Sequence, residues 1–167
     1  MQIYVLRHGI AVMRDDLEVK NDAERQLTPK GKRQLRQIAA AMKTMGLRFD
    51  LILSSPYLRA KQTAEIVAES LKLKRQLRFS GTLVPDGSPT NLIRQLDELK
   101  PAPEHILLVG HEPYLSRLIS FLTTGGVDLM MDFKKGGLCK LEVEKFSYDR
   151  CATLAWLLTP KQMKMMM

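Results

Sequence analysis

Residues 2–12, QIYVLRHGIAV, decide how the N-terminal part of this 167-residue chain folds. A β-prone, apolar run ends at Arg7-His8-Gly9, and the chain then turns apolar again. A continuous apolar run of this length is typical of a strand that is buried on both faces of a parallel sheet. The sequence therefore places an arginine and one of only three histidines where a buried strand ends.

The rest of the chain alternates between strand-like and helical patterns. A serine or threonine followed by proline is a typical helix start, because the first supplies a cap and proline suits the first turn. We expect helices that open at Thr28-Pro29, Ser55-Pro56 and Ser88-Pro89, and one after Pro113. We expect strands at 2–6, 49–55, near 76–79, within the apolar run 104–110, at 137–146 and at 151–159.

This alternation predicts an α/β fold, a three-layer α/β/α sandwich with a mostly parallel central sheet. Residues 137–146 alternate between apolar and polar side chains, so we expect them to pair with 151–159 as an antiparallel edge near the C-terminus. The length suits one domain, assigned to residues 1–160. The methionine-rich segment 161–167 is expected to be a disordered tail.

Composition is that of an ordinary globular protein, with 45% hydrophobic and 26% charged residues. The net charge of +8 favours an acidic or phosphorylated partner. Its basic residues are scattered and carry no zinc-finger or aromatic RNA-binding signature, so we expect no nucleic-acid partner. No apolar run is long enough for a membrane span, and Cys139 and Cys151 are read as free thiols. A cytoplasmic monomer is the simplest expectation.

Four side chains follow the predicted strand ends, where an open parallel sheet places its ligand crevice. Arg7 and His8 follow the first strand, Arg59 lies near the start of the helix after the second, and His111 follows the strand in 104–110. Arginine matches phosphate oxygens, and imidazole can act as acid, base or nucleophile near neutral pH. The cluster therefore suits a multiply charged oxyanion, whereas its arginines repel a metal ion. The third histidine, His105, begins a strand at the far end and is interpreted as structural.

The sequence resembles the histidine phosphatase superfamily, the phosphoglycerate-mutase-like proteins. Four motifs in the family's order carry the resemblance: LRHGIA at 6–11, LTPKGKRQ at 27–34, SSPYLRAKQTA at 54–64 and GHEP at 110–113. The small size and the spacing around 25–31 look most like the SixA-type phosphohistidine phosphatases. The resemblance implies that His8 is a nucleophile that forms a covalent phosphohistidine, with Arg7, Arg59 and His111 as the phosphate pocket. It implies no metal and no cofactor.

The chemistry agrees with these implied roles. A nucleophilic histidine must present an unprotonated nitrogen, so the other ring nitrogen of His8 should donate to a backbone carbonyl. Arg7, Arg59 and a protonated His111 would neutralise the oxygens of the transferred phosphoryl group.

The proton donor is left open by the sequence. Many relatives carry a glutamate after the QTA helix, but the corresponding stretch here has only Asp86, and another branch places an acid where Glu112 stands. The donor could be Glu112, Asp86 or no dedicated residue. Without a strong acid a site should favour phosphohistidine, whose imidazole leaving group has a conjugate acid with a pKa of about 6.5.

The predicted function is a phosphohistidine protein phosphatase that acts on a signalling phosphotransfer protein. Only a short helix and loops fill the segment between Arg59 and His111, which leaves little material for a lid over a small metabolite. One alternative is a small-molecule phosphomonoesterase of the same superfamily. Another is a non-catalytic phosphate-binding module, and a charge-driven nucleic-acid binder is a further possibility from a different class.

Overall fold

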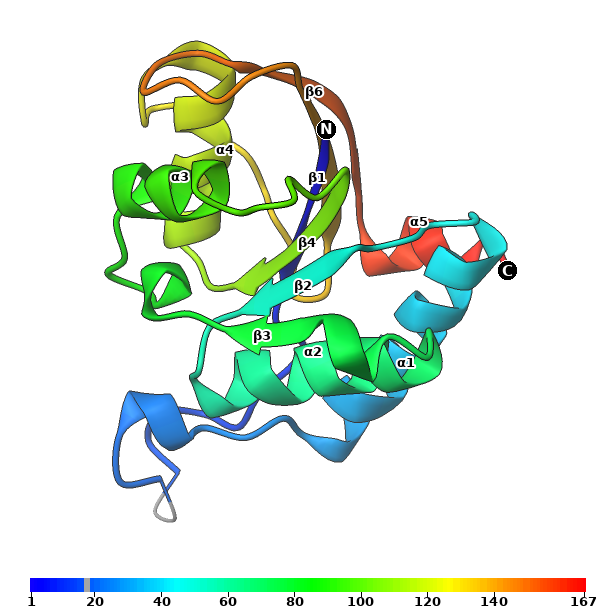
Figure 1. Ribbon diagram of the computed structural model, residues 1–167. Coiled ribbons are helices and arrows are strands. Elements are labelled where there is room, and N and C mark those ends of the chain that lie inside the picture. Colours follow the sequence, from blue (N-terminus) through cyan, green and yellow to red (C-terminus); the bar gives the residue numbers. More distant parts are fainter. Residues whose placement is uncertain (17–18) are drawn as a thin grey trace.

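The computed structural model describes residues 1–16 and 19–167. One six-stranded sheet forms its centre (Figure 1). The strands are β1 (Gln2–Arg7), β2 (Leu51–Ser54), β3 (Leu77–Phe79), β4 (His105–Gly110), β5 (Leu138–Val143) and β6 (Ala152–Leu158). The helices are α1 (Pro29–Thr44), α2 (Leu58–Ser70), α3 (Pro89–Asp97), α4 (Tyr114–Thr124) and α5 (Pro160–Lys164), with short 3-10 turns η1 (Asp22–Glu24), η2 (Lys74–Gln76) and η3 (Gly81–Leu83).

The sheet is mostly parallel, with an antiparallel edge. Its strand order is β3-β2-β4-β1-β5-β6. The first four strands in this order run parallel, whereas β5 pairs antiparallel with β1 and β6 pairs antiparallel with β5. The predicted α/β class and the C-terminal antiparallel edge are therefore confirmed.

Helices cover both faces of the sheet, as Figure 1 shows, with α1, α2 and α5 on one side and α3 and α4 on the other. Alternate residues of β1 belong to two different cores. Ile3 and Val5 pack with the α3 and α4 side, whereas Tyr4 and Leu6 pack with the α1 and α2 side. Burial on both faces explains why the strand sequence is continuously apolar.

Three of the four predicted helix starts form as expected, including that of α4, which begins directly after Pro113. The Thr28 hydroxyl accepts the Gly31 N–H at 3.0 Å at the start of α1, and the Ser88 hydroxyl caps α3 in the same way. The expected start at Ser55-Pro56 is wrong, because α2 begins at Leu58 without a side-chain cap. The Ser55 side chain is not available as that cap because it contacts a buried histidine.

The expected disordered tail also needs correction. Thr159 and Gln162 form a reciprocal capping box, so the chain folds into α5 after β6. Met163 is fully buried on the α1 side of the sheet, while Met165–Met167 are exposed. A local cap and one buried side chain therefore order a segment whose composition alone suggested fraying.

No helix within residues 1–16 and 19–167 is long and apolar enough to cross a membrane.

Candidate active site

The carboxyl ends of the parallel strands bring the predicted site residues together. In the β1–β4 register Arg7 lies opposite Gly110, and the His8 N–H donates to the Gly110 carbonyl at 3.0 Å. His111 therefore follows directly beside His8, and the two rings have centroids 5.2 Å apart. Arg59 reaches the same place from the first turn of α2.

The His8 ring is fixed in one orientation by its two nitrogens. Its Nδ1 lies 2.7 Å from the Gly9 carbonyl oxygen, which can only accept, so Nδ1 carries the proton. Its Nε2 receives the Arg59 Nε–H at 3.2 Å and therefore presents a lone pair. The hydrogen bonds alone thus select the tautomer that a nucleophilic Nε2 requires.

The electrostatic surroundings keep His8 neutral. The residue is only 5% exposed. Burial, with help from the nearby charges of Arg59 and Arg7, lowers the pKa of His8 to about 3, although the hydrogen bond to Gly9 acts in the opposite direction. At neutral pH the imidazole is therefore uncharged, although Arg59 and Arg7 lie nearby.

The guanidinium of Arg59 is held from its outer side by Asp22 of η1. Its Nη2 lies 2.9 Å from the Asp22 carboxylate, and its Nη1 donates to the Asp22 backbone carbonyl at 2.6 Å. Arg14 and Arg25 contact the other oxygen of the same carboxylate. Burial alone would raise the pKa of Asp22, but hydrogen bonds from Arg25 and Arg59 outweigh it and hold the pKa at about 2. Asp22 thus orients Arg59 so that Nε faces His8.

Arg7 is bound to the loop that precedes β5. Its Nη1 donates to the Phe133 carbonyl at 2.6 Å. The Gly136 N–H donates to the carbonyls of both Arg7 and His8 at 3.1 Å, and the Arg7 N–H donates to the Gly137 carbonyl. The Nε atom of Arg7 is buried without a hydrogen-bond partner among the described residues. It remains a donor at the site for a ligand oxygen.

His111 is positioned by Ser55. The His111 Nε2 lies 2.8 Å from the Ser55 hydroxyl, which also accepts the Tyr57 N–H at 3.2 Å. The hydroxyl can donate its own proton to Nε2, and in that arrangement the His111 proton resides on Nδ1. This Nδ1 is buried and has no partner among the described residues.

The charge of His111 differs from the expectation. Burial, followed by the charge of Arg59, lowers the pKa of His111 to about 2. The ring is therefore neutral in this structure and not the cation that the sequence suggested. It offers its Nδ1–H as a neutral donor to an oxyanion.

Thr63 and Gly9 lock α2 against the loop after β1. The Thr63 hydroxyl donates to the Arg59 carbonyl at 2.7 Å and accepts the Gly9 N–H at 3.1 Å. A Cβ at Gly9 would lie 2.7 Å from Leu35 Cδ1, so a larger residue there would require the Leu35 side chain to move. These contacts give the site a rigid frame.

The two candidate acids lie in different surroundings. Glu112 accepts both the N–H and the hydroxyl of Ser116 at the start of α4, so its carboxylate is engaged in a local cap. Asp86 is an exposed residue on the loop between η3 and α3. Neither carboxylate forms a hydrogen bond or ion pair with the His8 cluster among the described residues, although the charge of Glu112 acts to raise the pKa of Arg7 against the effect of burial.

His105 occupies the opposite end of β4. It is the first residue of that strand, and its Nδ1 lies 3.5 Å from the Asp50 carboxylate. This position separates it from His8 and His111 by the length of the strand. Within residues 1–16 and 19–167, no group of three His, Cys, Asp or Glu side chains could hold a metal ion.

Sequence reasoning missed the residues that support the cluster. Ser55 was interpreted as a helix cap, Thr63 appeared only within the motif at 54–64, and Asp22 was not singled out. Asp22 lies three residues before Arg25, outside the 25–31 spacing that carries the family resemblance. As a whole the cluster offers one lone-pair nitrogen surrounded by donors, an arrangement that suits attack on a phosphoryl group.

Comparison with known proteins places this geometry in context. The model of the histidine phosphatase superfamily, branch 1, matches residues 3–79. A protein of Picosynechococcus sp. named as uncharacterized is 37% identical over 142 residues, which cover 84% of each chain. The phosphohistidine phosphatase SixA of Escherichia coli K12 is 27% identical over 166 residues, covering 99% of this chain and 98% of that protein.

The likeness extends to the three-dimensional fold. A structure of the protein histidine phosphatase SixA complexed with tungstate superposes with a TM-score of 0.82 at 27% sequence identity. The superposition covers 96% of this chain and 98% of that chain. The similarity therefore extends well beyond the N-terminal segment, residues 3–79, that the superfamily model matches.

Proposed function

The chain belongs to the histidine phosphatase superfamily and is a phosphatase hydrolase, and from this premise we propose that it is a phosphohistidine protein phosphatase. Its substrate is a signalling phosphotransfer protein, and the reaction passes through a covalent phosphohistidine on His8. The observation that carries the proposal is the His8 ring, whose Nδ1 donates to Gly9 while the buried Nε2 faces Arg59. This is a neutral nucleophile inside a cationic pocket.

The proposed reaction has two transfers. In the first, Nε2 of His8 attacks phosphorus in line, the N–P bond of the substrate breaks, and its imidazole leaves with a proton. Arg7, Arg59 and the Nδ1–H of His111 bind the phosphoryl oxygens as charge spreads over them. In the second, water attacks phosphorus, the bond to His8 breaks, and inorganic phosphate leaves. To admit the phosphoryl group, the Arg59–His8 hydrogen bond must open.

We choose phosphohistidine as the substrate because the carboxylates near the site are already engaged by other residues. Asp22 is held by arginines, and Glu112 is engaged by Ser116, so neither is placed as an uncommitted acid. General acid catalysis typically contributes about 10²–10⁴-fold, and it is needed most for an alkoxide leaving group. An imidazole leaving group can be protonated before the bond breaks, because its conjugate acid has a pKa of about 6.5. SixA proteins, to which the chain is similar, carry phosphohistidine phosphatase in their names.

The proposed setting is a monomer in the cytoplasm. Cys139 and Cys151 are both unpaired thiols, which fits a reducing compartment. The tungstate bound by a SixA structure is a tetrahedral oxyanion, which is consistent with a phosphoryl pocket in the same fold.

The test compares wild type with His8→Ala on two substrates, a phosphohistidine-bearing phosphotransfer protein and an aryl phosphate. We expect phosphate release from the phosphoprotein to be faster and to disappear in His8→Ala. Wild type quenched during turnover with an alkaline denaturant should retain phosphate on His8, because these conditions preserve phosphohistidine. His105→Ala is the matched control, because it removes a histidine from the far end of β4 and should keep wild-type turnover.

Other outcomes contradict the proposal. Strong aryl phosphate turnover with an inert phosphoprotein would point to a small-molecule phosphomonoesterase. Phosphate release that persists in His8→Ala would show that His8 is not the nucleophile. Release from neither substrate would leave a phosphate-binding module on this fold.

A further inference from the structure

An open groove with a volume of about 660 Å³ begins at Arg7 and runs between the loop before β5 and the start of α5. Its walls include four cationic side chains, Arg7, Lys134, Lys135 and Lys161, against one carboxylate, Asp132, for a net charge of +3. Both Lys135 and Lys161 are exposed and form no ion pair with the described residues. The groove thus carries more positive charge than its own residues balance.

The loop that carries Lys135 is fixed relative to the nucleophile. Gly136, the next residue, has a left-handed φ of 75° and donates its N–H to the carbonyls of both Arg7 and His8. Phe133 is bonded to the Arg7 side chain from the other side of Lys135. Hydrogen bonds on both sides of Lys135 therefore fix the backbone of this loop beside the His8 cluster.

Lys161 lies on the opposite wall of the groove, and the backbone that carries it is also well ordered. It lies in α5, whose first turn is closed by the Thr159–Gln162 capping box, and α5 is anchored by the buried Met163. Thr159 and Pro160 line the groove beside it. The two lysines thus face the groove from two ordered elements.

An anion that binds among like charges without a counterion reduces the repulsion between them. Burial, together with the charges of Arg7, Arg25 and Arg59, lowers the pKa of Lys135. In the proposed reaction the phosphoryl group occupies Arg7 and Arg59, and Asp22 already neutralises Arg25. A second negative group is therefore needed to balance Lys135 and Lys161.

We propose that this groove is a docking subsite for acidic side chains that flank the phosphorylated histidine of a protein substrate. The inference rests on the proposed function and adds how the substrate is chosen. Arg7 belongs to both the phosphate pocket and the groove, so an acidic residue next to the phosphohistidine can enter the groove while the phosphoryl group reaches His8.

The lining favours a protein over a nucleic acid. The groove contains no aromatic side chain on which a base could stack. Asp132 is paired with Lys134, so the cations left to an acidic peptide are Arg7, Lys135 and Lys161. Ile10 and Pro160 provide apolar contacts that suit the methylene groups of glutamate and aspartate side chains.

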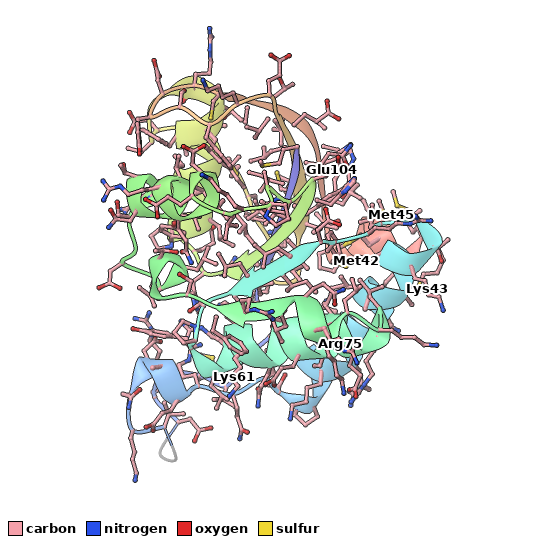
Figure 2. All side chains as sticks on the ribbon, viewed as in Figure 1. Met42, Lys43, Met45, Lys61, Arg75 and Glu104 are labelled. Carbon is pink, nitrogen blue, oxygen red and sulfur yellow. The ribbon has the colours of Figure 1, made fainter. Side chains whose placement is uncertain are left out.

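The experiment uses two peptides that differ only in the residues next to a central histidine, acidic in one and the corresponding amides in the other. Fluorescence anisotropy measures binding of the unphosphorylated peptides at low salt, and phosphate release measures turnover of their phosphohistidine forms. The protein variants are Lys135→Gln/Lys161→Gln and the charge-matched control Lys74→Gln/Arg75→Gln. Figure 2 shows Arg75 beside α2, and η2 directly precedes β3 at the opposite edge of the sheet.

We expect wild type to prefer the acidic peptide by about tenfold, because two partly desolvated charge pairs each contribute modestly. The preference should fall to within about twofold in Lys135→Gln/Lys161→Gln and persist in the control. Added salt should weaken it in wild type. The ratio of kcat/KM for the two phosphopeptides should follow the same pattern.

Equal binding of the two peptides by wild type, or an unchanged preference in the groove variant, would overturn the inference. So would a DNA oligonucleotide that binds as tightly as the acidic peptide and depends on the same lysines. If the acidic preference holds in binding while neither phosphopeptide is hydrolysed, the groove stands and the proposed function fails. If both are hydrolysed equally well, the proposed function stands and the groove fails.

Discussion

A histidine lies at each end of β4, and the two histidines have very different surroundings. His105 at the amino end is partly exposed beside Asp50, whereas His111 just beyond the carboxyl end is 1% exposed and bonded to Ser55. The carboxyl end also gathers His8, Arg7 and Arg59. The difference shows that the direction of the parallel strands, and not the presence of a histidine, decides where chemistry can occur.

The largest expected effect comes from Arg59. Arg59→Lys keeps the positive charge but loses the fork that contacts His8 through Nε and Asp22 through both Nη atoms. Loss of a donor aimed at the transition state typically costs about 10²–10³-fold, and we expect that loss in kcat/KM for the phosphohistidine substrate.

Arg78→Lys is the control, because this arginine is exposed on β3 and its Nη1 contacts only backbone carbonyls. Steady-state kinetics of both variants would check the contrast. A loss of less than about fivefold in Arg59→Lys would mean that charge alone, without the fork, is sufficient at this position.

The second effect is on acid stability. The pKa of His111 is about 2 in the folded protein and about 6.5 when unfolded, so below pH 6.5 the unfolded state binds more protons. The free energy of unfolding should therefore fall as pH decreases from 6.5. Replacing His111 by Asn should remove about 2–3 kcal/mol of that decrease between pH 6.5 and pH 4.5.

Urea unfolding of wild type and His111→Asn at several pH values would measure this dependence. His8 should act in the same direction, because its pKa is lowered to about 3. An unchanged pH dependence in His111→Asn would show that His111 already takes up its proton in the folded state.

Ser55 offers a smaller and more specific test. Ser55→Ala removes the hydroxyl partner of His111 Nε2 and should release the ring to exchange its two tautomers. We expect about a tenfold decrease in kcat, because a displaced proton on Nδ1 weakens one donor to the phosphoryl group. Ser54→Ala is the control, since the hydroxyl of this buried neighbour bonds only to the Ser55 carbonyl among the described residues.

The ¹⁵N chemical shifts of the His111 ring give a readout that a purely structural role would not move. Wild type should show a protonated Nδ1 and an unprotonated Nε2, and Ser55→Ala should show averaged shifts. Identical spectra in the two proteins would exclude Ser55 as the residue that sets the tautomer.

The same contrast between local and distant contacts explains what the sequence could and could not predict. Arg7, His8 and His111 were assigned to one edge because each follows an apolar strand, and strand direction is a local pattern. The roles of Ser55 and Asp22 depend on contacts across more than 35 residues, which no local pattern reports. The α5 helix was missed because only Pro160 and Met163 of this helix are buried, and a single buried methionine is an isolated signal in a methionine-rich segment.

The smallest expected effect is at Glu112, on the same carboxyl end as His111. Its carboxylate is occupied by the Ser116 N–H and hydroxyl, and glutamine can keep an oxygen at that cap. Glu112→Gln should therefore change phosphohistidine turnover by less than about twofold, against the 10²–10⁴-fold loss expected of a general acid. Kinetics on a phosphohistidine peptide and an alkyl phosphate, with Asp86→Asn in parallel, would measure this.

A loss of about 100-fold confined to the alkyl phosphate in either variant would identify that residue as the proton donor for alkoxide leaving groups. The same loss on both substrates would contradict the argument that an imidazole leaving group needs no dedicated acid.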